Sequence, residues 1–326
     1  MKNKKFIFLA KRLVRMLVLL VLISILSFSI VVNSPVDALQ AHLGSQVSVL
    51  SEEQRAAILA QLDLDKTPTE RYLKWVGHII HGDFGQSTVY NQPVSKMIVE
   101  RFRETFFLMI IAWALSGLIG FSLGVWAAIK EGTWIDRIIK TYCMILASSP
   151  NFWLGLLFLM FFAGYLRLFP IGLTGPLGML ASEVTLSERI YHMMLPAITL
   201  SLVSLADITL HTRMKLLEIM ASDFILFARA NGKSLKAIIR QHALRNILLP
   251  AVTLQFLSFS ELFGGAVFIE QIFSYPGLAG LVQEAAMKGD VALLLGIVLV
   301  SAIWIFTGNM IADILYVVID PRIKES

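Results

Sequence analysis

Long apolar runs dominate this sequence and limit what the chain can fold into. A helix needs about 20 mostly apolar residues to cross a bilayer, and six runs suit that role. Strands of membrane barrels are shorter and alternate apolar with polar residues, which these runs do not. We therefore predict an all-α integral membrane protein with six transmembrane helices. The predicted spans are Met16–Val32, Phe106–Ile129, Thr141–Tyr165, Met193–His211, Ile247–Ile269 and Val291–Val318.

The composition supports this class. Charged residues make up 16% of the chain and hydrophobic residues 56%, whereas a soluble domain carries about a quarter charged residues. The single cysteine, Cys143, lies in an apolar run and supports neither a disulfide framework nor a thiol metal site. No His/Cys cluster has strong metal-site spacing. The basic residues behind the net charge of +5 flank the spans, which argues against a nucleic-acid partner.

Lys and Arg residues predict the orientation of the spans. Most of the 28 lie in the N-terminal tail, the 130–140 turn, the 212–246 loop and the 319–326 tail. Cytoplasmic loops carry such an excess, so we expect both termini in the cytoplasm. The first apolar run exceeds that of a signal peptide, about 7–15 residues, and no clean cleavage site follows. We expect it to remain as a helix.

The predicted organisation comprises residues 1–32 as a cytoplasmic tail and first span, 33–105 as an external segment, 106–318 as a five-helix core with a cytoplasmic loop at 212–246, and 319–326 as a cytoplasmic tail. In the external segment, Ser51 to Gln54 has the pattern of a capping box that opens a helix. A second short helix is predicted from an apolar face formed by Tyr72, Trp75, Ile79 and Ile80.

The basic loop before the fifth span carries helix signals. Ser222 or Asp223 can cap the start of a helix. About two turns fit before Asn231-Gly232, because glycine tolerates the left-handed conformation that ends helices. Ser234 can cap a second helix that continues toward the next span.

A helix of two turns is unstable alone in water, so this one is expected to pack against a partner. Phe224, Phe227 and Ala228 have the i, i+3, i+4 spacing of one helix face, and they form the predicted contact. Arg229 is expected to point away from it. An amphipathic helix that rests on lipid headgroups is the alternative interpretation.

Gly232-Lys233-Ser234 resembles the end of a phosphate-binding loop, but the rest of that motif is missing. The motif needs a glycine at position 227, which is Phe227, and no strand precedes it. We therefore expect no nucleotide to bind this chain. If ATP drives its activity, another subunit must supply the ATPase.

The same loop resembles a known family. Ala228–Gly232, followed by His242–Asn246 and Leu249-Pro250, is similar to the cytoplasmic signature of ABC importer transmembrane permeases, and more narrowly to the first-permease type of the dipeptide/oligopeptide/nickel family. The general signature begins Glu-Ala-Ala, where this chain has Leu226-Phe227-Ala228. Other stretches that resemble the family are Asp65–Gly85, Ser149–Gly155, Leu195–Ala197, Glu270–Gly277 and Asn309–Arg322.

The resemblance implies the type I importer fold in a prokaryotic plasma (inner) membrane. It further implies a heterodimer with a second permease subunit, two ABC ATPase subunits that bind ATP and Mg, and an extracytoplasmic solute-binding protein. This chain would be a transport subunit without catalysis or cofactor. The residues that the resemblance assigns to ATPase coupling are Phe224, Phe227, Ala228, Arg229, Ala230, Gly232, His242 and Arg245.

Besides Asp313 in the sixth span, three Asp, Glu or His residues lie in predicted spans, where charge is costly and usually faces an interior or a cavity. Asp207 and His211 are i, i+4 neighbours, and Glu261 lies in the fifth span. They either line a path for a cation or a substrate amine, or they are structural, with Asp207 paired to His211 and Glu261 bonded across helices. Glu261–Gly265 is closer to the nickel permeases, so peptides and nickel or its chelates both stay open as substrates.

Two other classes fit the sequence less well. A membrane-embedded enzyme would need catalytic groups at one depth, and no motif brings Ser, His and Asp together. An ion channel would need a filter or a charged ring, and none is visible.

Overall fold

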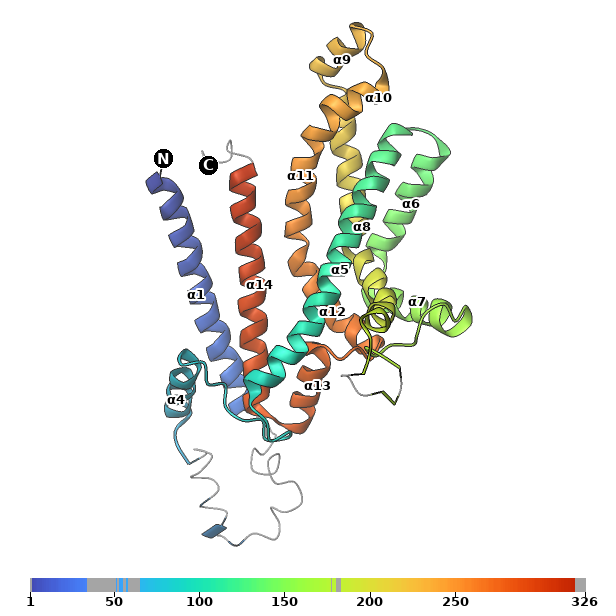
Figure 1. The fold of residues 1–326 in the computed structure, drawn as a ribbon. Helices are drawn as coiled ribbons and strands as arrows, with labels where there is room; N and C mark the ends of the chain where they lie inside the picture. Colours follow the sequence, from blue (N-terminus) through green and yellow to red (C-terminus); the bar gives the residue numbers. More distant parts are fainter. Residues whose placement is uncertain are drawn as a thin grey trace. The chain divides into compact units, whose positions relative to one another are not determined.

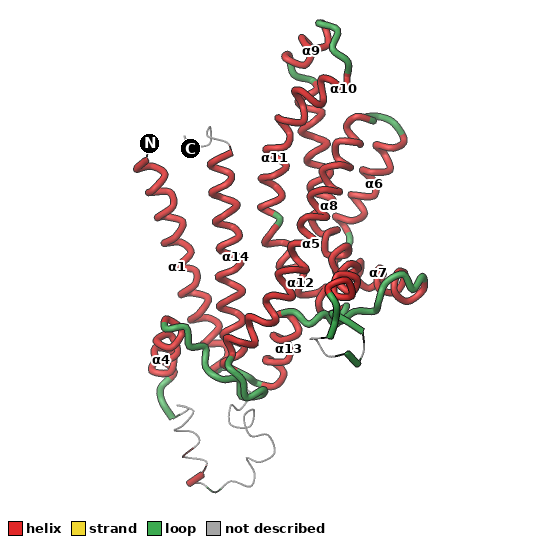
Figure 2. Tube along the Cα trace, in the orientation of Figure 1, coloured by secondary structure: helices red, strands yellow, loops and turns green. Residues whose placement is uncertain are grey.

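The computed structural model describes residues 2–33, 51, 53–54, 57, 65–176, 178–179 and 183–319. These residues are mostly helical (Figures 1 and 2), with an isolated bridge between Gln86 and Pro93, and the prediction of an all-α fold is confirmed. The elements are α1 (Lys2–Val32), α4 (Pro68–Ile80), α5 (Val94–Ile129), α6 (Trp134–Ser148), α7 (Asn151–Phe158), η2 (Leu159–Tyr165), α8 (Leu186–Met220), α9 (Asp223–Ala230), α10 (Leu235–Ile238), η3 (Ile239–Ala243), α11 (Leu244–Leu257), α12 (Phe259–Ile272), α13 (Leu278–Lys288) and α14 (Val291–Ile319).

Three helices in the described ranges are long and apolar enough to cross a membrane, at Ala10–Val32, Val94–Ile129 and Val291–Ile314. Three bent helix pairs pass the same test together. They are α6 with α7 and η2, bent by 111°, the two parts of α8, bent by 49°, and most of α11 with α12, bent by 45°. If each bent pair crosses once, the total is the six spans predicted.

The predicted third span, Thr141–Tyr165, is not one helix. α6 ends at Ser148, and α7 begins at Asn151 after two residues in extended conformation, Ser149 and Pro150. Proline has no N–H to donate and disfavours the helical conformation of the residue before it. The prediction was wrong because it followed the apolar run through this proline.

The chain divides into two compact units, Met1–Glu104 with Gly277–Phe306, and Thr105–Pro276 with Thr307–Ser326. In the first unit, the Asp290 carboxylate accepts hydrogen bonds from Ser87 Oγ at 2.5 Å and from the Val89 N–H at 3.2 Å, which fixes the start of α14. The capping predicted at Ser51 is confirmed, because Gln54 N–H donates to Ser51 Oγ and Ser51 N–H donates to Gln54 Oε1.

The second short helix predicted in the 33–105 segment is α4. The rings of Tyr72 and Trp75 pack on Phe28 of α1, with centroids 5.3 and 6.0 Å away. Ile80 was predicted on that face, but it is 76% exposed. The reason is geometric, since one residue turns the helix by about 100° and moves Ile80 away from Ile79.

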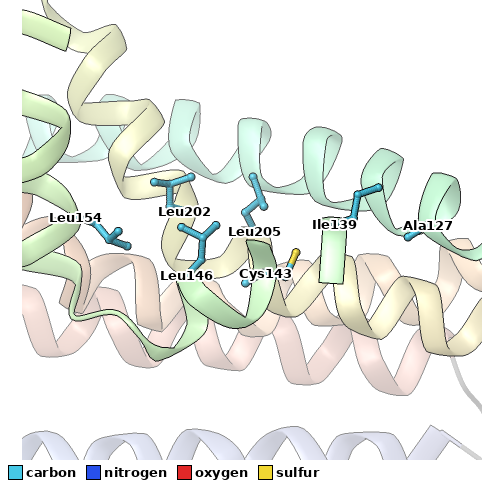
Figure 3. Packing of buried hydrophobic residues seen from close by; sticks show 8 residues of the cluster. Ala127, Ile139, Cys143, Leu146, Leu154, Leu202 and Leu205 are labelled. Carbon is cyan, nitrogen blue, oxygen red and sulfur yellow. The ribbon is translucent and has the colours of Figure 1, made fainter. Parts of the chain in front are cut away.

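The core of the second unit lies among α5, α6, α7 and α8 (Figure 3). It consists of Ala127, Ile139, Cys143, Leu146, Leu154, Leu202, Leu205 and Ala206. Glycine lets α5 approach α8 closely, because a Cβ added to Gly124 would lie 2.6 Å from the carbonyl oxygen of Thr209. Small residues at such contacts are typical of packed membrane helices.

Candidate functional site

The short helix predicted in the basic loop is α9. Its N-cap is Ser222, as predicted, but the Ser222 hydroxyl donates to the carbonyl of Ile219 at 2.5 Å and caps no N–H of α9. Asp223 places a negative charge in the first turn, where the helix dipole favours it. The start of α9 is therefore stabilised by the negative charge of Asp223, and the extended backbone of Ser222 marks its N-cap.

Gly232 ends α9 in the way its sequence predicts. Its φ is +75°, in the left-handed region. The N–H of Lys233 donates to the carbonyl of Ala228 at 3.2 Å, and the N–H of Gly232 donates to the carbonyl of Arg229 at 2.9 Å. This pair of bonds is the Schellman motif, which satisfies the last carbonyls of a helix.

α9 has an inner and an outer apolar face. Ile225 and Ala228 are buried against Ile238 of α10 and the end of α8. Phe224 and Phe227 are exposed, and Phe227 is 70% exposed. The prediction that Ala228 shares a face with both phenylalanines was wrong, because Ala228 lies three residues after Ile225 and packs with it.

Within the described residues, the chain thus supplies one partner for α9 and leaves its outer face open. Figure 1 shows α9 and α10 at the end of α8 and α11 that lies away from α12. Arg229, Ala230 and Gly232 are exposed. An exposed aromatic face on an anchored helix is suited to contact another protein.

The helix that follows α9 is capped by a residue of the same loop and contacts another. The Ser234 hydroxyl accepts the Ala237 N–H at 3.3 Å, so the predicted cap is confirmed. Lys233 Nζ lies 3.1 Å from His242 Nε2. His242 belongs to η3 and is half-buried. Arg245 is the second residue of α11, and its side chain lies outside the described part of the structure.

An ion pair near the end of α8 was missed by sequence reasoning. Arg213 donates from Nε to Asp136 Oδ1 at 2.6 Å and from Nη2 to Asp136 Oδ2 at 2.9 Å. Asp136 is 1% exposed and also accepts the Gly132 N–H at 3.1 Å. The pair joins α6 to α8 about 10 Å before α8 ends at Met220, so it braces the helix that leads into α9.

The three candidate pathway residues are all exposed in the chain. Asp207 and His211 lie on α8 and Glu261 on α12. Among the described residues, Asp207 makes no hydrogen bond or ion pair with His211, and Glu261 makes none across helices. Neither contact of the structural interpretation is therefore seen among the described residues, and the role of these three side chains stays a prediction. The described residues also hold no group of three or more His, Cys, Asp or Glu able to bind a metal ion.

Helices with these spans, breaks and close contacts match the membrane component of a known class of transport system. The family model for the binding-protein-dependent transport system inner membrane component matches residues 120–325, and the model for its N-terminal part matches residues 5–109. The chain belongs to this family. It is a multi-pass inner membrane protein and the permease subunit of an ABC importer, and such permeases act with ATPase and substrate-binding components.

Individual relatives support the same family assignment. The chain is 35% identical to the oligopeptide transport system permease protein AppB of Bacillus subtilis (strain 168) over 318 residues, which cover 97% of this chain and 99% of AppB. It is 32% identical to the dipeptide transport system permease protein DppB of Escherichia coli (strain K12), over 98% of each chain. The predicted assignment to the dipeptide/oligopeptide permeases is confirmed.

A solved structure shows the same fold. The MetNI methionine ABC transporter, in its inward-facing conformations, matches with a TM-score of 0.55 and 16% sequence identity. The match covers 69% of this chain and 96% of that chain. The predicted type I permease fold is confirmed by this likeness.

Proposed function

We propose that this chain forms half of the translocation pathway of a peptide importer. The relatives that match nearly the whole chain at 35% and 32% identity are named as oligopeptide and dipeptide permeases, and this observation carries the proposal. A second permease subunit forms the other half as a heterodimer. Two ATPase subunits lie on the cytoplasmic side of the membrane, where both termini of this chain also lie. A solute-binding protein delivers peptide from outside.

α9 is the part of the chain that we assign to ATPase coupling. Its inner face is fixed to α10 and α8, so the helix can move only with the ends of the spans. Phe224 and Phe227 on the open face would enter a cleft of an ATPase subunit. The exposed Arg229, Ala230 and Gly232 would border that contact, with His242 and Arg245 holding the next helix. Closure of the ATPase pair then moves α9 and rocks the spans between inward- and outward-facing states.

The chemistry of ATP belongs to the partners in this proposal. The ATPases bind ATP and Mg, and this chain binds no cofactor and catalyses no reaction. Within the membrane, Asp207, His211 and Glu261 would line the pathway, because exposed charges in spans are tolerated beside a cavity and costly in lipid. A carboxylate there can contact the amino group of a passing peptide.

Cross-linking tests the coupling assignment. In the assembled importer, Phe227→Cys should cross-link to an ATPase subunit. Met287→Cys is the control, since Met287 is 77% exposed on α13, on the predicted external side. The buried native Cys143 should not react. Cross-linking to the ATPase from position 287 and none from position 227 would contradict both the contact and the orientation.

Substrate uptake tests the assignment to peptide transport. Membrane vesicles that contain the importer and its binding protein should take up a labelled dipeptide in an ATP-dependent manner. Nickel and its chelates remain the alternative because of the Glu261–Gly265 stretch. Uptake of labelled Ni²⁺ without uptake of peptide would overturn the peptide assignment.

A further inference from the structure

α4 is a short helix with both ends fixed by the local sequence. At its start, Glu70 N–H donates to Thr67 Oγ1 at 3.3 Å, and Thr67 N–H donates to Glu70 Oε2 at 3.0 Å, which makes a capping box. At its end, Gly82 has a φ of +79°, and the Asp83 N–H donates to the carbonyl of His78 at 3.0 Å. The helix therefore presents defined faces.

One face of α4 is fixed against the last part of α1. Tyr72 and Trp75 contact the buried ring of Phe28. The hydroxyl of Tyr72 lies 2.7 Å from Ser24 Oγ, which is also buried. Ser24 lies about 12 Å before the end of α1 at Val32, because a helix rises about 1.5 Å per residue.

This contact fixes the depth of α4. The apolar part of α1 runs over 23 residues, or about 34 Å, close to the roughly 30 Å of a hydrocarbon core. A contact about 12 Å before its end therefore lies within the membrane boundary. Tyr and Trp are also the residues enriched at that boundary. This depth favours a position of α4 beside the span over one above it in bulk water.

A second apolar face of α4 has no cover in the described chain. Leu73 is 63% exposed and Ile80 is 76% exposed. These residues are seven positions apart and share one face with Val76. The adjoining end of α1 is likewise apolar and exposed at Leu26 and Ile30, so the two helices present apolar surface at the same depth.

The polar face of α4 lies on the other side of the helix. His78 is about 140° around the helix from Leu73, and Lys74 is about 100° from it. Both residues are exposed. A polar face opposite an apolar face is typical of helices that lie in the plane of a lipid–water interface.

We propose that α4 lies in the lipid–water interface on the membrane face where α1 ends, with Leu73, Val76 and Ile80 in contact with lipid. Lys74 and His78 face the headgroups and the water. Lipid is the occupant because the Tyr72–Ser24 and Phe28 contacts hold this face at the depth of the bilayer, next to the lipid-facing surface of α1. The proposal concerns a surface outside the coupling loop and holds for any transported substrate.

Spin labels in the assembled importer, reconstituted in lipid vesicles, test this placement. In a Cys143→Ala background, labels at Leu73→Cys and Ile80→Cys should collide more with oxygen than with a water-soluble nickel complex. The label at His78→Cys, on the same helix, should show the reverse order. All three positions are exposed, so the labels displace no core residue.

Two results would overturn the proposal. Equal access of the nickel complex to all three labels would place the face of Leu73 and Ile80 in water. Labels at 73 and 80 that are immobilised and reached by neither reagent would show a protein partner on this face, either the second permease or the binding protein.

Discussion

Arg213 and Asp136, 77 residues apart in the sequence, form a bidentate ion pair in which Asp136 is almost fully buried. Nε and Nη2 of Arg213 meet the two carboxylate oxygens separately, so the pair fixes both the distance and the rotation between α6 and α8. Since α8 continues toward α9, this pair holds the end of the span that leads into the proposed coupling helix.

Breaking this pair should destabilise the fold. Arg213→Ala leaves the Asp136 carboxylate buried without its main partner, which costs about 3 kcal/mol or more. The buried Cys143 is the single cysteine and lies in the neighbouring core, so its reaction with a thiol dye reports unfolding. The melting temperature measured with this dye should fall.

The matched control lies two residues further along α8. Lys215 Nζ and Glu218 Oε2 are 2.7 Å apart, but both side chains are exposed. Such surface pairs contribute about 1 kcal/mol or less. Glu218→Gln should leave the melting temperature nearly unchanged, and an equal fall for both variants would contradict the role given to burial.

The two faces of α9 should respond differently to truncation. Ile225→Ala removes a buried side chain and should cost about 2–5 kcal/mol locally. Hydrogen exchange in α9 should then become faster. Phe227→Ala removes an exposed ring, so exchange should stay the same while less ATPase subunit co-purifies. The opposite pattern would show that the outer face is structural.

Gly232 should tolerate only residues that accept a left-handed backbone. A Cβ added there meets no atom within 4 Å, so the penalty is conformational and not steric. For an L-residue it is roughly 1–2 kcal/mol. Gly232→Val should abolish uptake while membrane insertion stays intact, and Gly232→Asn should retain much of it. Normal uptake by the valine variant would show that Gly232 is not needed for ATPase coupling.

Even alanine should be destabilising at Gly124. The added Cβ would lie 2.6 Å from a backbone oxygen of α8 and 2.7 Å from Thr212 Cβ, which forces the two helices apart. Overpacking of this kind costs about 1–3 kcal/mol, and the melting temperature should fall. Gly264→Ala is the control, because a Cβ at Gly264 meets nothing within 4 Å. An equal fall for both variants would contradict the close approach of α5 and α8.

Local signals in the sequence predicted local structure well. Gly232 ended α9 and Ser234 capped the next helix because the required backbone angle and hydroxyl belong to those residues. Pro150 was also a local signal, but the apolar run around it outweighed it in the prediction, and the helix break there was missed.

Contacts between distant segments could not be predicted in the same way. The inner face of α9 depends on Ile238, which follows a turn, and its position relative to Ile225 is set only by the fold. The pair of Asp136 and Arg213 depends on the packing of two helices. A single sequence shows charges near membrane ends, but it does not show which charges meet.

The measurement that most directly tests this account is uptake of labelled peptide by vesicles containing the assembled importer, with and without ATP on the side of α9. Uptake should require ATP and the binding protein, and Phe227→Asp should abolish it without a change in melting temperature. Peptide uptake that persists without ATP, or that is unaffected by Phe227→Asp, would contradict the central claim that α9 couples these spans to an ATPase.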